Sequence, residues 1–500
     1  MPVFVGCDLG TMGSKAAVVS DAGVILAEAY EEVPMTHPRA GWAEQDSLQI
    51  EASAHRVIRQ ALTASGRDDV AAVAFSGQMS GIGTIDRHFN PATHYDSWLD
   101  ARCEPYIEQM REHADQVTAI SGCPPTYSHG PKILWWRGQR PEVYAGIAKF
   151  LPISSFVAAR AAGLSADDAF VDDTHLHYSN LADTARGVWS AELLDQFGVD
   201  ADILPRIVRP TQVIGEITSA AAATTGLPSG TPIAAGAGDT AAACLGAGAV
   251  VPGRAFDAAG TASVFAMCVD GFQPDLQTHT LLASRGIVPG TFVNLAFVNG
   301  GGLALRWFRD HVAKLSSADA YRQLDELAAE VPAGSEGCMW YPHLQGRVLP
   351  PSPNARGGWI GLTSRHERGH LFRAMLEGIA LEYAEWARLC GQVGGTRLTE
   401  VRAVGGGAAS RLWNQIKADV LGINWVPVVG EGGALGTALV AAAASGHVTD
   451  LARTIEIWQA TRESFEPNQQ VHQRYQTVRR AYRVVAEALS EVYEQLPTES

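Results

Sequence analysis

A single acid stands in a run of small residues at positions 231–248, TPIAAGAGDTAAACLGAG. Asp239 has few polar neighbours along the chain, so its carboxylate would lose water and its pKa would rise. Perturbed acids in clefts are often functional. The glycines of this run would let a ligand approach the backbone closely. The alternative is a helix N-cap, because an Ala-rich segment that ends near Gly246 follows the acid. The run taken alone favours that alternative.

Two turns rich in glycine and hydroxyl groups lie half a chain apart. The first, DLGTMGSK at 8–15, joins two short apolar runs that we expect to be strands. Its N–H groups, Thr11 and Lys15 could hold an anion, and Asp8 could hold a hydrated Mg²⁺. The second turn contains Gly260 and Thr261, in the same context. The spacing predicts a duplicated domain in which each half offers a phosphate loop to a shared cleft. The alternative is an ordinary hairpin turn that uses glycine for its backbone angles.

Polar residues also follow a predicted buried strand at 70–75. Gln78, Met79 and Ser80 stand between two glycines, a position that lines a ligand crevice in open α/β sheets, although a plain loop is an equal alternative. The segment WLDAR at 98–102 combines Asp100 with an arginine and a tryptophan, a mixture suited to sugar recognition. The alternative for Asp100 is a surface ion pair of little energetic value.

Glycines precede two predicted helices in the second half. Gly302 comes directly before a helical stretch at 303–312, and Gly406 and Gly407 lie between a strand and a helix. Glycines in these places favour the approach of a phosphate or a flat ring. His175 and His177 could share one face of a strand and bind a metal, but no third ligand is evident, so a structural or substrate-rim role is favoured.

Helical spacing predicts further elements. A helix with apolar residues from Ile50 to Leu62 should stop at Gly66, and Ser364 with Glu367 should form a capping box. A heptad stripe marks the last helix: Val471, Tyr475, Val478, Tyr482, Val485, Leu489, Val492 and Leu496. Docking on the second domain is the preferred interpretation, and a homodimer seam is the alternative.

Composition narrows the class of protein. Five hundred residues, 46% of them hydrophobic, suggest two or more globular domains, and a net charge of −15 argues against nucleic acid and anionic membrane as partners. Seven scattered cysteines without a CxxC pair indicate neither disulfides nor zinc, and they fit a reduced cytoplasm. No signal peptide is expected, and the Ala/Gly runs are interrupted or too short to span a membrane.

Together these motifs resemble the FGGY family of carbohydrate kinases, most closely its xylulokinases. The matching segments follow in order over nearly the whole chain: DLGT at 8–11 with Lys15, GWAEQ at 41–45, GQM at 77–79, WLDAR at 98–102, Gly238-Asp239, GTAS at 260–263, RAMLEG at 373–378, and GGGAAS at 405–410 with Trp413, Gln415, Ala418 and Asp419. Each motif is weak alone, but the ordered set is highly specific.

The resemblance implies an α/β fold of duplicated actin-like, ribonuclease-H-like domains with an interdomain cleft. Residues 1–249 would hold the sugar and residues 250–500 the nucleotide. It further implies that Asp239 is the general base for transfer of the γ-phosphoryl group of ATP to a terminal sugar hydroxyl. The implied roles of the other residues are these: Thr11, Lys15, Gly260, Thr261 and Gly302 hold phosphates, Asp8 binds Mg²⁺ through water, Gly406 and Gly407 admit adenosine, and Gln78, Met79, Ser80 and Asp100 line the sugar pocket with Asp239.

One departure concerns the substrate. Xylulokinases usually have a histidine where this chain has Ser80, so a water or a larger substrate could fill the space. We therefore expect a xylulokinase, with ribulose, another ketose, a polyol or gluconate as alternative substrates. A rival from a different class is an actin-like ATPase or sugar-responsive binding protein without phosphotransfer.

Overall fold

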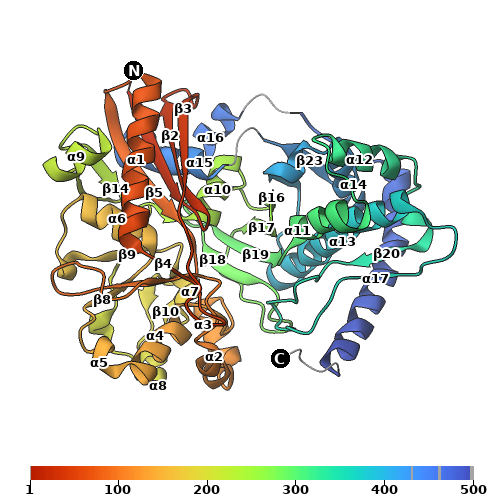
Figure 1. Ribbon diagram of the computed structural model, residues 1–500, viewed down its shortest axis with the longest axis horizontal. Helices are drawn as coiled ribbons and strands as arrows, with labels where there is room; N and C mark the ends of the chain where they lie inside the picture. The colour runs from red at the N-terminus through yellow and green to blue at the C-terminus, as the bar shows by residue number, and fades with distance from the viewer. Residues whose placement is uncertain (1, 429–431, 460–462, 496–500) are drawn as a thin grey trace.

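The computed structural model describes residues 2–428, 432–459 and 463–495, which form two lobes, each built around its own sheet (Figure 1). The sheet of the first lobe has the order β13-β14-β5-β1-β2-β3, with β15 beside β5. Its strands are β1 (Val3–Leu9), β2 (Gly13–Ser20), β3 (Ile25–Glu32), β5 (Val70–Gly77), β13 (Val213–Glu216), β14 (Pro232–Ala234) and β15 (Ala237–Gly238). The β-branched and apolar runs of the sequence become the central strands β1, β2 and β5, which are buried on both faces, whereas β3 alternates exposed and partly buried residues.

The second sheet repeats the topology of the first. Its order is β18-β19-β17-β16-β22-β23, formed by β16 (Arg254–Ala259), β17 (Ser263–Val269), β18 (Leu282–Arg285), β19 (Phe292–Val298), β22 (Glu400–Val404) and β23 (Asn424–Pro427). In each lobe the first strand runs antiparallel to the second and parallel to a later one: β1 with β2 and β5, and β16 with β17 and β22. This repetition confirms the predicted duplication.

Long helices cover these sheets. The predicted helix is α1 (Ser47–Ser65), which buries its apolar face and ends at Gly66 in the left-handed conformation. In the second lobe α13 (Arg368–Gly394) packs against α12 (Ala320–Ala329) and α14 (Arg411–Leu421). The capping-box prediction is wrong in detail: Glu367 is itself the N-cap of α13 and its partner is His370, because the helix begins three residues later than Ser364 suggested.

The small residues of the opening run serve close packing of helices. α10 (Asp239–Ala247) crosses α15 (Gly433–Ala444), and a Cβ at Gly246 would lie 2.0 Å from the Gly432 carbonyl oxygen. A Cβ at Gly236 would likewise lie 1.8 Å from the Phe75 oxygen. The expectation that these glycines admit a ligand is therefore wrong for Gly236 and Gly246, since neighbouring backbone fills the space.

α15 lies against the first sheet although it follows the second sheet in sequence (Figure 1). Its small residues pack on β1, where a Cβ at Gly6 would lie 2.2 Å from the Ala434 oxygen. The predicted boundary between residues 249 and 250 lies between α10 and β16, and it stays a prediction. α16 (Leu451–Trp458) follows α15.

Smaller elements complete both lobes. They are β4 (Glu44–Gln45), β6 (Gly83–Ile85), β7 (Tyr95–Asp96), α2 (Glu104–Arg111), α3 (Ala114–Ser121), α4 (His129–Gln139), α5 (Pro141–Tyr144), β8 (Lys149–Leu151), α6 (Ile153–Ala161), β9 (Phe170–Asp172), α7 (Leu176–Ser179), β10 (Ala182–Asp183), β11 (Val188–Trp189), α8 (Ala191–Phe197), β12 (Arg206–Val208), α9 (Ser219–Thr225), α11 (Gly301–Trp307), β20 (Met339–Tyr341) and β21 (Gly358–Ile360).

The last helix, α17 (Gln469–Glu494), packs on α13 and α14. Tyr475 and Tyr482 of the predicted stripe are buried there, which supports docking on the second lobe. Farther along, Val492 is 50% exposed while Tyr493 is buried, because a straight helix drifts away from a 3.5-residue repeat. Leu496 lies outside the described residues.

Candidate active site

Asp239 is the first residue of α10, and Gly238 is the N-cap, so the N-cap interpretation of Asp239 is wrong. The Thr240 backbone N–H donates to Asp239 Oδ1 at 2.5 Å, and the Thr240 hydroxyl contacts the same oxygen at 3.2 Å. Asp239 is partly exposed. One carboxylate oxygen is thus held by its own helix terminus, while the described residues offer no hydrogen bond to Oδ2.

The surroundings raise the pKa of Asp239 to about 7. Burial is the largest cause, and the charge of nearby Asp8 adds to it, while the bonds from Thr240 and the charge of His175 oppose the rise. A carboxylate with a pKa near neutrality matches the requirements of general-base catalysis, because it can accept a proton and release it again.

Asp8 lies at the end of β1, opposite the N-terminus of α15. The Ser76 hydroxyl donates to Asp8 Oδ1 at 2.7 Å, and Thr437 of α15 donates to Ser76 at 2.7 Å. Asp8 Oδ2 lies 3.0 Å from where a Cβ at Gly433 would be. The beginnings of α10 and α15 and two carboxylates are thus gathered at one place.

The predicted Mg²⁺ role of Asp8 fits this donor set. The charge of Asp8 disfavours ionisation of Asp239, and a cation between substrate phosphates and Asp8 would relieve that repulsion. No cluster of three or more His, Cys, Asp or Glu side chains able to hold a metal is found in the described part of the chain. Mg²⁺ commonly binds through one or two carboxylates, waters and substrate phosphate oxygens rather than in an all-protein cage.

The hairpin between β1 and β2 is bonded to the sugar-side loops. Trp98 Nε1–H donates to Thr11 Oγ1 at 2.8 Å, and Gln45 Nε2–H donates to the Thr11 carbonyl at 3.1 Å. Gln78 donates in turn to Gln45 at 2.7 Å. Lys15, predicted to hold phosphate, forms an ion pair of 3.2 Å with Glu28 on β3.

The loop after β5 lies next to Asp239. A Cβ at Gly238 would be 2.5 Å from Met79 Sδ, so Met79 packs directly on the residue before the acid. Ser80 has φ 64°, a left-handed conformation that non-glycine residues rarely adopt. The Ser80 hydroxyl donates to the Tyr127 carbonyl at 2.9 Å, and the Ser80 carbonyl accepts a hydrogen bond from Lys132 Nζ at 3.0 Å. The Ser80 hydroxyl is therefore already bonded within the protein.

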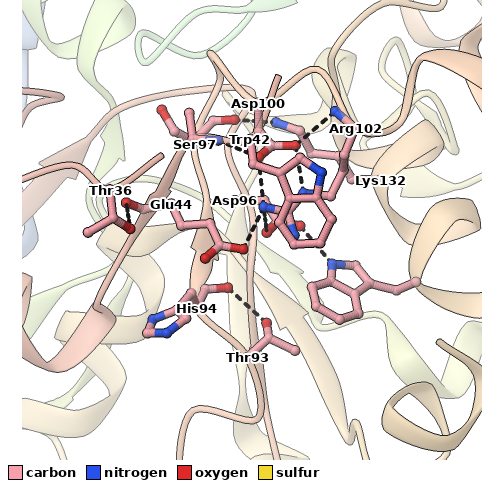
Figure 2. A network of polar contacts seen from close by, with 12 residues as sticks. Thr36, Trp42, Glu44, Thr93, His94, Asp96, Ser97, Asp100, Arg102 and Lys132 are labelled. Atoms are coloured by element: carbon pink, nitrogen blue, oxygen red, sulfur yellow. Dashed lines mark hydrogen bonds and ion pairs between the residues drawn. The ribbon is translucent and has the colours of Figure 1, made fainter. Parts of the chain in front are cut away.

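Asp100 belongs to a buried polar network beneath this loop (Figure 2). Its two oxygens accept hydrogen bonds from the Arg102 guanidinium at 2.8 and 2.7 Å and from the Ala43 N–H at 2.7 Å. The guanidinium lies 3.7 Å from the centre of the Trp42 ring and also contacts Glu44. The surface-ion-pair alternative is wrong, because Asp100 is fully buried. The network positions the sugar-side loops and occupies both carboxylate oxygens of Asp100.

The second lobe contains a pocket of about 920 Å³. It is lined by five of the seven residues predicted to hold the nucleotide, Gly260, Thr261, Gly302, Gly406 and Gly407, but not by Thr11 or Lys15. A Cβ at Gly406 would meet nothing within 4 Å, whereas a Cβ at Gly302 would lie 1.9 Å from the Gly260 oxygen. Gly406 thus borders open space, and Gly302 lets α11 approach the β16–β17 hairpin.

Sequence reasoning missed several residues of these sites. In the pocket the Ser410 hydroxyl donates to Asp325 at 2.7 Å, and burial raises the pKa of Asp325. Beside Asp239, the Gly238 N–H donates to Thr174 Oγ1 at 2.9 Å. A predicted strand holding His175 and His177 is not found: His175 precedes the short helix α7 and His177 lies inside it. Such partners come from distant segments, so no local pattern could reveal them.

The chain matches two parts of one family. Residues 3–246 match the N-terminal domain of the FGGY family of carbohydrate kinases, and residues 258–445 match its C-terminal domain. The chain belongs to the FGGY carbohydrate kinases. Its fold is therefore the two-domain, actin-like and ribonuclease-H-like α/β fold, and its chemistry is transfer of a phosphoryl group to a carbohydrate.

Individual relatives carry different names. A protein of Bacillus subtilis named xylulose kinase is 29% identical, with 96% of this chain and 95% of that protein covered. A Klebsiella pneumoniae protein named autoinducer-2 kinase is 31% identical, with 86% and 82% covered. The crystal structure of xylulose kinase from Rhodospirillum rubrum has a TM-score of 0.89 at 26% identity, covering 99% of this chain and 100% of that one.

Two expectations from composition also have outcomes. All seven cysteines are buried, and none is paired with another. Among the helices of the described ranges, none has the length and apolar character needed to cross a membrane.

Proposed function

We propose that this FGGY kinase uses ATP to phosphorylate the terminal hydroxyl of a ketopentose, with D-xylulose converted to D-xylulose 5-phosphate. Asp239 carries the proposal, because its pKa near 7 and its place between the Met79 loop and Asp8 suit a base that serves a sugar hydroxyl. The relatives named xylulose kinase support the choice of sugar.

In the proposed reaction, a sugar hydroxyl oxygen attacks the γ-phosphorus of ATP while Asp239 accepts the hydroxyl proton. The bond from γ-phosphorus to the bridging oxygen breaks, and ADP leaves. Thr240 holds Asp239 Oδ1 and leaves Oδ2 for the proton. Mg²⁺, when bound near Asp8, would supply neutralisation of the phosphate charge. Gly260 and Thr261 would contact the phosphates, and Gly406 and Gly407 would border the adenosine.

Another substrate is the second candidate, and Ser80 favours it. Its hydroxyl already donates to Tyr127, so it supplies the sugar with no donor unless that bond breaks. A site that lacks one hydrogen-bonding group discriminates differently among hydroxyl patterns. The relative named autoinducer-2 kinase also shows that similar chains carry a different name.

The test is coupled measurement of ADP release with D-xylulose, ribulose, other ketoses, polyols and gluconate, with the product identified by mass. We expect the highest kcat/KM for D-xylulose. A higher value for another compound would overturn the sugar assignment. ADP release without a phosphorylated product for every compound would instead support an ATPase or binding protein.

A further inference from the structure

Three buried histidines lie near one another in the first lobe. His129, His175 and His177 are 5%, 1% and 0% exposed. No described residue makes a hydrogen bond to Nε2 of His129 or to Nε2 of His175. Buried polar atoms without partners are costly, so each calls for a partner that the chain itself does not supply. A metal is not that partner, because the described residues form no cluster of three or more candidate ligands.

His175 is the histidine whose orientation is fixed by a partner. Its Nδ1 lies 2.6 Å from Asp172 Oδ2, and since a carboxylate only accepts, Nδ1 carries the proton. Asp172 Oδ1 also accepts from the Thr174 backbone N–H at 3.0 Å. In the neutral ring Nε2 is then a hydrogen-bond acceptor, on the ring edge opposite Asp172.

The segment that holds His175 is bonded to the candidate active site. Thr174 Oγ1 accepts from the Gly238 N–H at 2.9 Å, directly before Asp239. The charge of His175 also acts on Asp239. Gly238 is in turn covered by Met79. The imidazole is thus held beside the base and the sugar-side loop.

The other two histidines are better explained as structural. The His177 ring packs against Tyr178 at an angle of 41° with centroids 4.1 Å apart, it bonds to the backbone of Thr174, and burial lowers its pKa to about 3. Burial also lowers the pKa of His129, with further lowering by His175 and Lys132. His129 thus lies close to His175, but no described carboxylate orients its ring.

Anchoring of the segment does not explain His175. The neighbouring Asp173 already holds the segment by ion pairs to Arg209 and to Arg285 of β18, the latter at 2.9 Å. Neither pair involves the imidazole. Nε2 of His175 is therefore a buried polar atom for which the described residues supply no hydrogen bond.

We propose that His175 is a specificity-determining residue of the sugar site, whose Nε2 forms a hydrogen bond with a sugar hydroxyl other than the one that Asp239 deprotonates. It supplies an imidazole from the 172–178 segment, while the Ser80 hydroxyl is bonded to Tyr127. This inference rests on the proposed function in that the ligand is a sugar, but it does not require D-xylulose.

Two substitutions of His175 distinguish the role of Nε2 from that of Nδ1. His175→Asn places an amide near Nδ1 and keeps the contact with Asp172, whereas His175→Gln reaches the place of Nε2. We expect His175→Asn to raise KM for D-xylulose about tenfold with kcat changed less than about threefold, as loss of one hydrogen bond predicts. His175→Gln should stay within about threefold of the parent in KM, since it keeps a polar atom there.

Deoxy sugars identify the contact. For the parent enzyme, kcat/KM is measured with D-xylulose and its 1-, 3- and 4-deoxy analogues. His175→Asn should abolish the penalty for one analogue and leave the other penalties intact. His177→Asn is the matched control, expected to lower Tm without changing the pattern. An unchanged KM and pattern in His175→Asn, or the same change in His177→Asn, would overturn the proposal.

Further measurements distinguish failure of this proposal from misfolding and from failure of the sugar assignment. Tm of His175→Asn and sugar-independent ATP hydrolysis of every variant should match the parent, because the pocket of the second lobe is untouched. If His175→Asn does not fold, His175→Ala decides: loss of the penalty for one analogue supports the contact, and unchanged penalties for all analogues contradict it. If the parent enzyme does not phosphorylate D-xylulose, the sugar assignment fails, and the same comparison is made with the best compound of the panel and its deoxy analogues.

Discussion

The two hairpins that face the active centre share a topology but differ in their surroundings. The turn between β1 and β2 is bonded to other loops, since Thr11 accepts hydrogen bonds from Trp98 and Gln45. The turn between β16 and β17 is exposed and borders a pocket of about 920 Å³ through Gly260 and Thr261. The first lobe is therefore organised before ligand binds, which suits selection of a sugar. The second offers open backbone, which suits a nucleotide.

The largest expected effect concerns Asp239, the proposed base. Asp239→Asn should lower kcat about 10²- to 10⁴-fold, the usual range for loss of a general base. Because the pocket of the second lobe does not include Asp239, nucleotide affinity should stay within about twofold of the parent. Timed assays in which the product is identified by mass measure kcat, and titration with a fluorescent nucleotide measures nucleotide affinity. Near-normal phosphorylation would refute the assignment of the base.

The raised pKa of Asp239 predicts a dependence of stability on pH. The folded-state value of about 7 lies above the usual 3.8, so the folded protein binds the proton more tightly than the unfolded chain. The stability of the parent relative to Asp239→Asn should therefore fall as pH rises from about 4 to about 7, and level off above that. Denaturant unfolding of both proteins at pH 4.5, 6 and 8 measures the difference. A constant difference would contradict the shifted pKa.

Two glycines of the nucleotide pocket should respond differently to alanine. Gly302→Ala places a Cβ 1.9 Å from the Gly260 oxygen, so the hairpin must shift, with a cost of about 1–3 kcal/mol and a raised KM for ATP. Gly406→Ala meets nothing within 4 Å and should leave Tm nearly unchanged. Thermal unfolding and ATP kinetics test the pair. An equal loss of stability in both variants would show that backbone packing around Gly302 does not make it less tolerant of alanine than Gly406.

The smallest expected effects come from substituting the threonine in the turn of each hairpin. Thr11→Val removes the acceptor of Trp98 Nε1–H, so we expect a loss of about 1–3 kcal/mol in the free energy of unfolding and a raised sugar KM. Thr261 is exposed, so Thr261→Val should leave the free energy of unfolding within about 0.5 kcal/mol of the parent while raising KM for ATP. Chemical denaturation with kinetics for each substrate measures both. If the two variants behave alike, the proposed contrast between the hairpins is wrong.

Much of the architecture was accessible from local sequence. Apolar runs predicted β1, β2 and β5, helical spacing predicted α1 up to Gly66, and the two Gly-Thr turns predicted the duplication. The second-half positions expected to hold nucleotide do share one pocket, which Thr11 and Lys15 do not line. These predictions depend on periodicity and turn chemistry, which act over a few residues.

The errors have a common physical origin. The sequence could not reveal that the Gly432 carbonyl occupies the space beside Gly246. Nor could it reveal that Asp100 accepts hydrogen bonds from Arg102 and Ala43. The partner of the Thr11 hydroxyl, Trp98, is 87 residues away. Contacts of this kind are specified by how sheets and helices meet, which no local pattern encodes.

By itself the sequence determined the family, the paired hairpins and the acid that is set among small residues, because short-range chemistry and ordered motifs carry that information. Only the tertiary structure decided which glycines border open space and which fit against backbone. It also decided that Asp8 lies close enough to raise the pKa of Asp239, and that His175 stands beside this acid. Distances between segments far apart in the chain exist only once both lobes have packed.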